Sequence, residues 1–209
     1  FCTLYRDSPM EKAKMTQLIR CLNIAYSFFA TMLTFIYDSC VIITVKKPAQ
    51  PKGIGLIRID SIGDFILWLD AAKEFRNLYP YAKITLIANH TWSDLARLLP
   101  YWDEVISVDR KRLTRNLPYR FKILRQIRQL GFEAAIQPAF SREYLRGDSL
   151  IRASGALHRM GSTGDLSNIN WWQKRISDKW YSRLIPAAAK PLMELQRNAE
   201  FMRGLGLRD

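Results

Sequence analysis

The sequence predicts an α/β fold in which helices flank a doubly wound parallel sheet. From residue 54 onward, short apolar runs alternate with amphipathic stretches whose apolar residues recur at helical spacing. Strands joined by helices of that length need right-handed crossovers, which place the strands parallel in one sheet. At 209 residues, the chain is long enough for one such domain and an appendage, without a disulfide or a metal to stabilise the core.

The appendage is an apolar amino-terminal segment, residues 19–45, which we expect to form a helix. Its apolar core, residues 24–37, is shorter than the roughly 20 residues that a spanning helix needs. A helix lying on a membrane surface is favoured; a helix packed on the domain, a true span and an uncleaved signal are the alternatives. A secretory signal is disfavoured because no small-residue cleavage site follows. Prolines, a glycine and lysines in residues 46–53 predict a linker, which separates a segment at 1–50 from the main domain at 51–209.

Five strands are predicted in the main domain. The first, IGLIRI, is an apolar run of the kind that is buried in a parallel sheet, and KITLIA and EVISV are similar runs further along. EAAIQ and a shorter run follow after helical stretches. The predicted strands are residues 54–59, 83–88, 104–108, 133–137 and 157–161.

The predicted helices lie between these strands and after the last one. The helix after the first strand carries Phe65, Trp68 and Phe75 at helical spacing. A later, basic helix has Pro118 in its first turn and is closed by Gly131. The predicted helices are residues 65–79, 90–99, 118–130, 148–153 and 191–203. Together, the strands and helices describe a Rossmann-like domain.

Residues 162–190 are expected to form a long, partly ordered loop. They contain three of the six tryptophans, several turn-forming residues and five basic residues. Loops of this length inside compact domains are usually functional.

The charge of the chain indicates the kind of partner that it binds, and its cysteine content indicates the cellular compartment. The excess of 32 Lys and Arg over 19 Asp and Glu gives a net charge of +13, which favours an anionic partner such as a phosphorylated lipid or a nucleotide. Nucleic acid is disfavoured because the chain has no recognisable nucleic-acid-binding motif. Cys2, Cys21 and Cys40 are odd in number and lack metal-ligand spacing, so we expect neither disulfides nor a metal site, and a reducing cytosolic setting. A first residue other than Met leads us to expect a piece of a longer protein.

The junction between the first strand and its helix is the most informative motif. It reads RIDSIGDF, from Arg58 to Phe65, and such junctions face the ligand crevice of a doubly wound sheet. Gly63 permits a tight turn or a close backbone approach, and Ser61 with the first free amides of the helix suits an anion. Asp64 is placed to accept a proton from a hydroxyl group. Asp and Ser are also preferred helix caps, so a purely structural role for Asp64 stays open.

Two further observations concern the same crevice. No G-x-G-x-x-G follows the first strand, which argues against a dinucleotide-dependent enzyme. The fourth strand ends near Ser141 and Arg142, which are candidates to meet a phosphate or carboxylate of a ligand. A solvated loop position is the alternative for Arg142. The candidate anion- and ligand-binding residues are therefore Arg58, Ser61, Gly63, Ser141 and Arg142.

Several stretches resemble glycosyltransferase family 9, the ADP-heptose:lipopolysaccharide heptosyltransferases. LIRIDSIGDFILWLDAAKEFRNLYPYAKITLIAN is similar to the opening of that family, in which a strand ends in R-x-[DS]-x-[IL]-G-D before a helix. LLPYWDEVISVD, LGFEAAIQP and MELQRNAEFMRGLGL are weaker matches to the amino-terminal domain of that family. The resemblance covers roughly residues 54–206. One departure is Asp70, which stands where the family often has proline, some six residues past the aspartate of the G-D pair.

The resemblance implies the amino-terminal half of a GT-B glycosyltransferase, in which two Rossmann-like domains face one another. It implies inverting transfer without a metal or other cofactor, with Asp64 as the base. The implied donor is a nucleotide sugar such as ADP-heptose, held mainly by a second domain that is absent here. The implied acceptor is an anionic, lipid-linked core oligosaccharide at the cytoplasmic face of the inner membrane, where we expect a peripheral protein. A non-enzymatic module that binds membrane surfaces or anions is the alternative.

Overall fold

The computed structural model describes residues 9–207, which form two compact units on either side of the Ser39–Cys40 bond. Helix α1, Pro9–Thr44, begins ten residues earlier than the sequence suggested. It is continuous because no glycine or proline lies between Pro9, which suits a first helical turn, and Pro48. By length and composition it is the one helix of the described chain that could cross a membrane, over Ser27–Thr44. Cys40 is free, whereas Cys2 lies outside the described residues.

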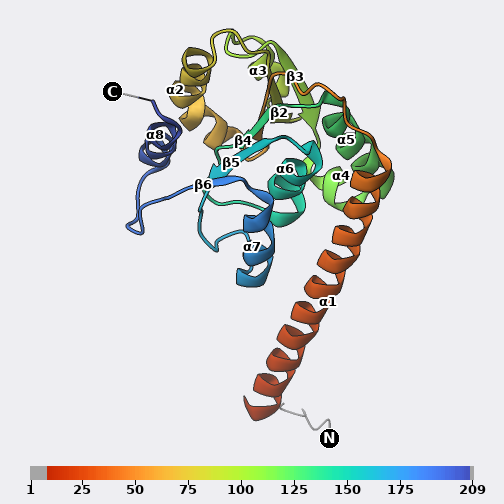
Figure 1. Cartoon of the computed structure of the whole chain (residues 1–209). Helices are drawn as coiled ribbons and strands as arrows, with labels where there is room; N and C mark the ends of the chain where they lie inside the picture. Colours follow the sequence, from red (N-terminus) through yellow and green to blue (C-terminus); the bar gives the residue numbers. More distant parts are fainter. Residues whose placement is uncertain (1–8, 208–209) are drawn as a thin grey trace, which may run out of the picture. The chain divides into compact units, whose positions relative to one another are not determined.

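The second unit contains a six-stranded, all-parallel sheet in the order β3-β2-β1-β4-β5-β6 (Figure 1). This confirms the predicted Rossmann-like α/β fold. Strand β1 lies in the middle, with Ile54 paired to Ile84 of β2 on one side and to Ala134 of β4 on the other. The strands are β1 Ile54–Arg58, β2 Ile84–Asn89, β3 Glu104–Val108, β4 Ala134–Gln137, β5 His158–Ser162 and β6 Arg183–Ile185.

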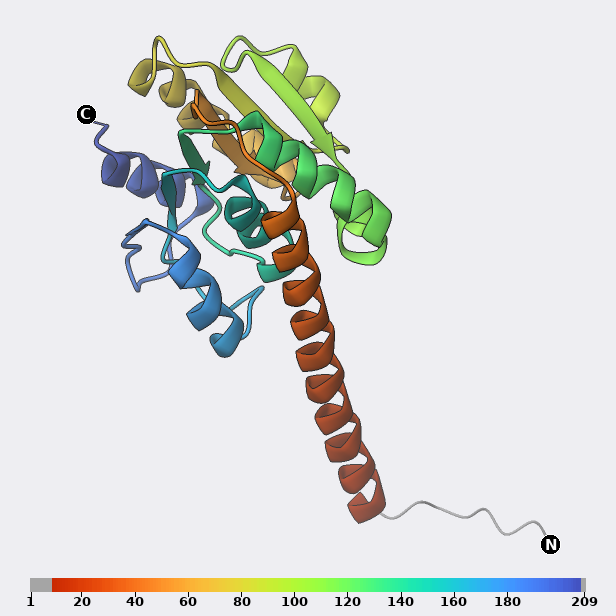
Figure 2. The same ribbon diagram turned by 45° about the vertical axis from the view of Figure 1, so that its right-hand side comes forward.

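Helices cover both faces of this sheet (Figure 2). Helices α2 and α8 pack together on one face, and α5 packs with α6 on the other. Helix α5 ends at Gly131, whose φ of 62° is the left-handed conformation that glycine adopts most readily. The helices of the second unit are α2 Ile62–Leu78, α3 Ser93–Arg97, α4 Arg110–Arg115, α5 Leu117–Leu130, α6 Ser149–Ser154, α7 Trp171–Ser177 and α8 Glu194–Leu205.

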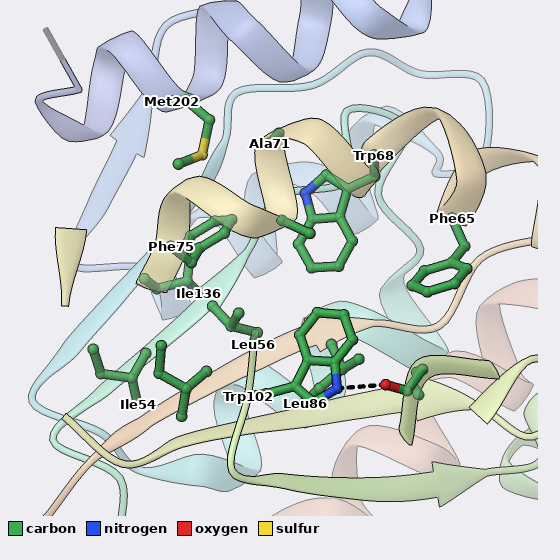
Figure 3. Close-up of a cluster of buried hydrophobic side chains, with 14 of the residues drawn as sticks. Ile54, Leu56, Phe65, Trp68, Ala71, Phe75, Leu86, Trp102, Ile136 and Met202 are labelled. Atoms are coloured by element: carbon green, nitrogen blue, oxygen red, sulfur yellow. Dashed lines mark hydrogen bonds between the residues drawn. The ribbon is translucent and has the colours of Figure 1, made fainter. Parts of the chain in front are cut away.

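An aromatic core fixes α2 on the sheet (Figure 3). The ring of Phe65 stacks on Trp92 with centroids 4.0 Å apart, and Trp68 lies parallel to Trp102 at 6.1 Å. The indole nitrogen of Trp102 donates a 2.8 Å hydrogen bond to the Ala96 carbonyl, the dashed line in Figure 3. These contacts hold the first turn of α2 at the carboxyl end of β1, where the sequence placed the functional motif.

The expectation of a long, partly ordered loop at residues 162–190 is wrong. The stretch contains α7, the 3-10 turn Asp178–Trp180 and strand β6, which pairs with β5 through Gly161 and Leu184. Helix α7 begins with a capping box between Asn170 and Gln173. Polar and turn-forming residues interrupt the apolar periodicity of this stretch, so the sequence pattern did not predict its short helix and strand. Such short elements are stabilised by tertiary packing.

Candidate functional site

A crevice lies at the carboxyl ends of β1 and β4, where the strand order reverses. Ligands of doubly wound sheets bind at this switch point. The cavity is about 110 Å³, which suits part of a ligand rather than a whole nucleotide sugar. Of three larger hollows, one along α5 and one between α2 and α8 lie away from the strand ends, whereas the third, of about 300 Å³, adjoins the crevice and shares Glu143 and Asn168 with it. The crevice is lined by Ile57, Ile59, Asp60, Ser61, Asp64, Arg110, Gln137, Ala139, Ser141, Glu143, Gly147 and Asn168.

Asp64 both caps α2 and lines the crevice. Its Oδ2 accepts hydrogen bonds from the Ser61 hydroxyl at 2.8 Å and the Ser61 backbone N–H at 3.3 Å, while its own N–H donates to Ser61 Oγ at 3.4 Å. Within residues 9–207, no hydrogen bond engages Oδ1 of Asp64. The two roles weighed for this aspartate therefore use different oxygens, because capping occupies one and leaves the other for a ligand.

Gly63 does not form the tight turn that the sequence suggested. It lies inside the first turn of α2, and a Cβ built on it would meet only Ser61 Oγ, at an ordinary 3.8 Å. Neither backbone strain nor crowding within the protein therefore requires glycine here. The second reason suggested by the sequence, close approach of a ligand to the backbone, stays a prediction.

Alanine at position 63 tests that reason. We expect Gly63→Ala to raise the free energy of unfolding by about 0.5–1 kcal/mol, because glycine is a poor helix former, yet to weaken ligand binding. Urea denaturation measures the first effect, and titration with the core oligosaccharide that the family resemblance implies as acceptor measures the second. Unchanged oligosaccharide affinity would show that the ligand stays clear of this residue.

Arg58 is a buried anchor and does not line the crevice. Its side chain is fully covered and ion-pairs with Asp60 at 2.9 Å and with Glu194 of α8 at 2.8 Å. It also donates to Asn198 Oδ1 and to the Asp64 carbonyl, each at 3.2 Å. The residue expected to bind an acceptor anion instead ties β1, α2 and α8 together.

Asp60 is a crevice residue that was not selected from the sequence. It follows β1 by two residues, and its side chain is 22% exposed. Burial raises its pKa from 3.8 to about 6; Arg58 and Arg110 oppose this rise, whereas the nearby carboxylates of Asp64 and Glu194 add to it. The sequence could have indicated this residue. Asp60 belongs to the RIDSIGDF motif and follows a buried strand by two residues, which places it at the ligand crevice of the sheet.

The raised pKa of Asp60 has a consequence for stability. A carboxyl that binds its proton more tightly in the folded state stabilises the protein below about pH 4, and this contribution is lost as the pH rises through 6. We therefore expect Asp60→Asn to be more stable than the wild type at pH 7 by about 1–3 kcal/mol. Urea denaturation from pH 4 to 8 measures the difference, which should shrink toward pH 4. A constant difference between the two proteins would exclude Asp60 as the titrating group.

Ser141 lines the crevice as expected, but its neighbour Arg142 does not. Arg142 is 1% exposed, forms an ion pair with Asp178, lies 3.8 Å from Asp148 and stacks over the Tyr181 ring. The expectation that Arg142 meets a ligand is therefore corrected, because its charge is used inside the protein, beside Asp178 and Asp148.

Arg110, Glu143 and Asn168 supply polar lining that the sequence analysis did not select. Arg110 Nη2 lies 2.9 Å from Glu143 Oε1, which also bonds Arg146 at 2.7 Å. Glu143 and Asn168 lie on either side of a segment that contains α6 and β5, so only the fold brings them to the crevice. Among residues 9–207, no three His, Cys, Asp or Glu side chains are grouped to hold a metal ion.

Comparison with known proteins identifies structural relatives of the fold. No protein-family model and no curated protein sequence matches the chain. Among solved structures, a glycosyl transferase family 9 protein from Veillonella parvula DSM 2008 matches with a TM-score of 0.61 at 17% identity, over 78% of this chain and 44% of that one. E. coli heptosyltransferase WaaC with ADP-2-deoxy-2-fluoro heptose matches with a TM-score of 0.58 at 16% identity, over 74% and 49%. At such identities the shared feature is the fold, and this chain spans less than half of either protein.

Proposed function

We propose that this chain is the acceptor-binding domain of an inverting glycosyltransferase. The observation that carries the proposal is the Asp64 carboxylate at the sheet's switch point, with one oxygen held by the helix cap and the other left for a ligand in the crevice. The structural relatives named as a heptosyltransferase and a family 9 glycosyl transferase support it. So does the similarity of residues 58–64 to the R-x-[DS]-x-[IL]-G-D motif.

In the proposed reaction, Asp64 Oδ1 accepts the proton of an acceptor hydroxyl as that oxygen attacks the anomeric carbon of the donor sugar. The new carbon–oxygen bond forms while the bond from the anomeric carbon to phosphate breaks. The nucleoside diphosphate leaves with the electron pair, and the configuration inverts. The cap from Ser61 fixes the carboxylate in one orientation, which reduces the entropy cost of aligning base and hydroxyl.

The substrates follow from the same proposal. The donor is a nucleotide sugar, with ADP-heptose the leading candidate because one structural relative is described with an ADP-heptose analogue. It is held mainly by a second domain outside these 209 residues, and transfer needs no metal or other cofactor. The acceptor is an anionic, lipid-linked core oligosaccharide at the cytoplasmic face of the inner membrane. The net charge of +13 suits such an acceptor.

Binding by this chain alone tests the acceptor assignment. We expect the 209-residue chain to bind a deacylated lipopolysaccharide core oligosaccharide, with an affinity that falls as salt rises, because surface charges are screened. Isothermal titration calorimetry measures the affinity, and a neutral oligosaccharide of equal size is the control. Equal binding of both sugars, or of neither, would count against the acceptor role and favour a module for some other anion.

A further inference from the structure

Helices α4 and α5 concentrate positive charge on one part of the second unit. Residues 110–130 contain eight Lys and Arg and no Asp or Glu. Of the eight, Arg120 is buried, where it donates to the Leu113 carbonyl at 3.0 Å and to Ser149 Oγ at 2.9 Å. Most of the others face outward, so the charge belongs to the surface rather than to the core.

We call the exposed part of these two helices the basic platform; its residues are Lys111, Arg112, Arg115, Leu117, Phe121, Lys122 and Arg125. Within the described chain, Lys111, Arg115, Lys122 and Arg125 form no ion pair, so their charges are not neutralised by neighbours. Arg112 lies over the Tyr119 ring at 4.5 Å. Unneutralised charge at this density attracts an anionic surface.

Apolar side chains lie among these charges. Leu117 is 52% exposed and Phe121 37%, and their spacing of four residues puts them on one side of α5 with Arg125. A shallow hollow along α5 is lined by Phe121, Lys122, Arg125, Gln126, Gln129 and Leu130. Exposed leucine and phenylalanine beside Lys and Arg are typical of helices that lie in a bilayer interface, whereas a soluble polyanion has no apolar layer to receive them.

We propose that the basic platform docks on the anionic headgroup surface of a lipid bilayer. Two contacts at the ends of the α4–α5 segment, one next to the apolar helix α1 and one at the crevice, support a membrane as the partner. Arg128 Nε of α5 donates a 2.6 Å hydrogen bond to the Val45 carbonyl, one residue after α1, whose apolar stretch Ser27–Thr44 ends there. At the amino-terminal end of the same segment, Arg110 is the first residue of α4 and lines the crevice.

Along the sequence, the basic platform therefore lies between Arg110, which lines the crevice, and Arg128, which binds the residue that follows α1. Docking it on lipid brings the crevice close to the headgroups. If the chain serves a lipid-linked acceptor, as proposed above, this is where the sugar of that acceptor would lie, because its lipid remains in the bilayer. The docking surface itself does not depend on that assignment, since it requires only anionic lipid.

Flotation of the full chain with vesicles tests the platform. The probes are phosphatidylcholine vesicles with and without about 30% phosphatidylglycerol, and the neutral vesicles measure any binding by α1 alone. The platform variant is Lys111→Glu, Lys122→Glu and Arg125→Glu combined. The matched control, Lys73→Glu, Arg175→Glu and Lys179→Glu, makes the same change of net charge at exposed positions outside α4 and α5. Circular dichroism and thermal melting check that both variants fold.

We expect the wild type and the control variant to prefer anionic vesicles, and the platform variant to lose that preference by at least about tenfold in partition coefficient. Binding to neutral vesicles should be the same for all three proteins. An equal loss in both variants, or a preference retained by the platform variant, would overturn the proposal. These vesicles contain no glycolipid, so their binding does not depend on the proposed transferase function. Failure of the transferase assignment would leave the vesicle result unchanged, and failure of vesicle binding would leave the transferase assignment unchanged.

Discussion

Replacing Asp64 by asparagine in the complete enzyme is expected to lower the rate of glycosyl transfer by about 10²–10⁴-fold, the usual contribution of a general base. Asparagine keeps the size of the side chain and can still accept hydrogen bonds from Ser61, but it cannot take up the acceptor proton. Affinity for the acceptor should change little, because the carboxylate is needed when the proton moves rather than when the sugar binds. Initial rates and acceptor titration measure the two quantities separately.

Asp64 also belongs to the capping box of α2, so its substitution could act through the cap as well as through the loss of a base. A second variant separates these two effects. Ser61→Ala removes the Ser61 hydroxyl from the capping box, at a cost of about 1 kcal/mol in the free energy of unfolding, but leaves the Asp64 carboxylate in place. We expect it to retain most of the transfer rate at a temperature where it is folded. A loss in Ser61→Ala as large as that in Asp64→Asn would indicate that the cap alone explains the motif.

Asp70→Asn is the matched control for the same charge change. Asp70 is exposed on α2 and lines the hollow between α2 and α8, away from the crevice. Its substitution should leave transfer within about twofold of the wild type, because Asp70 does not line the crevice and an exposed charge is screened by salt. Near-normal transfer by Asp64→Asn, with Asp70→Asn unchanged, would remove Asp64 from the mechanism.

The second large effect is expected on stability, from Arg142→Ala. Arg142 and Asp148 are both essentially inaccessible to water, and Tyr181 donates a 2.6 Å hydrogen bond to the Asp148 carboxylate beside them. Removing the guanidinium leaves a buried carboxylate without its cation, which costs about 3–5 kcal/mol in comparable buried pairs. Urea denaturation of the 209-residue chain measures the loss.

Two comparisons make this prediction specific. Arg175→Ala, at an exposed position, should change the free energy of unfolding by less than about 0.5 kcal/mol. Combining Arg142→Ala with Asp148→Asn should recover part of the lost stability, because the orphaned charge disappears. If Arg142→Ala instead melted like the wild type while losing oligosaccharide binding, the ligand-contact role suggested by the sequence would be restored.

Much of the fold could be predicted because its elements carry strong local signals. Each of the first five strands was predicted to within one residue at either end. The first four are short, largely apolar runs bounded by turn-forming or helical stretches, a pattern that is typical of buried strands. Helix α5 was found from Pro118 and Gly131 at its two ends. Strand β6 was missed because three residues, Arg183–Ile185, form a strand only when β5 is beside them.

The candidate site was predicted less completely. Asp64, Ser61 and Ser141 line the crevice, as their positions after strands suggested. Arg58 and Arg142 were chosen for their charge, but the sequence cannot tell whether an arginine faces solvent or a buried carboxylate. The position of Asp60 after β1 could have been used to place it in the crevice, but its raised pKa could not be predicted, because that results from burial and from neighbours in the fold.

The sequence by itself determined the layout of this protein: an apolar helix, a parallel sheet, and a carboxylate in the first turn of the helix that follows the central strand. Those features depend on the order of polar and apolar residues along the chain, which can be read directly. Only the tertiary structure decided which charges are available to a ligand. Availability depends on burial and on partners from distant segments, such as Glu194 beside Arg58 and Asp178 beside Arg142, and these are brought together only by folding.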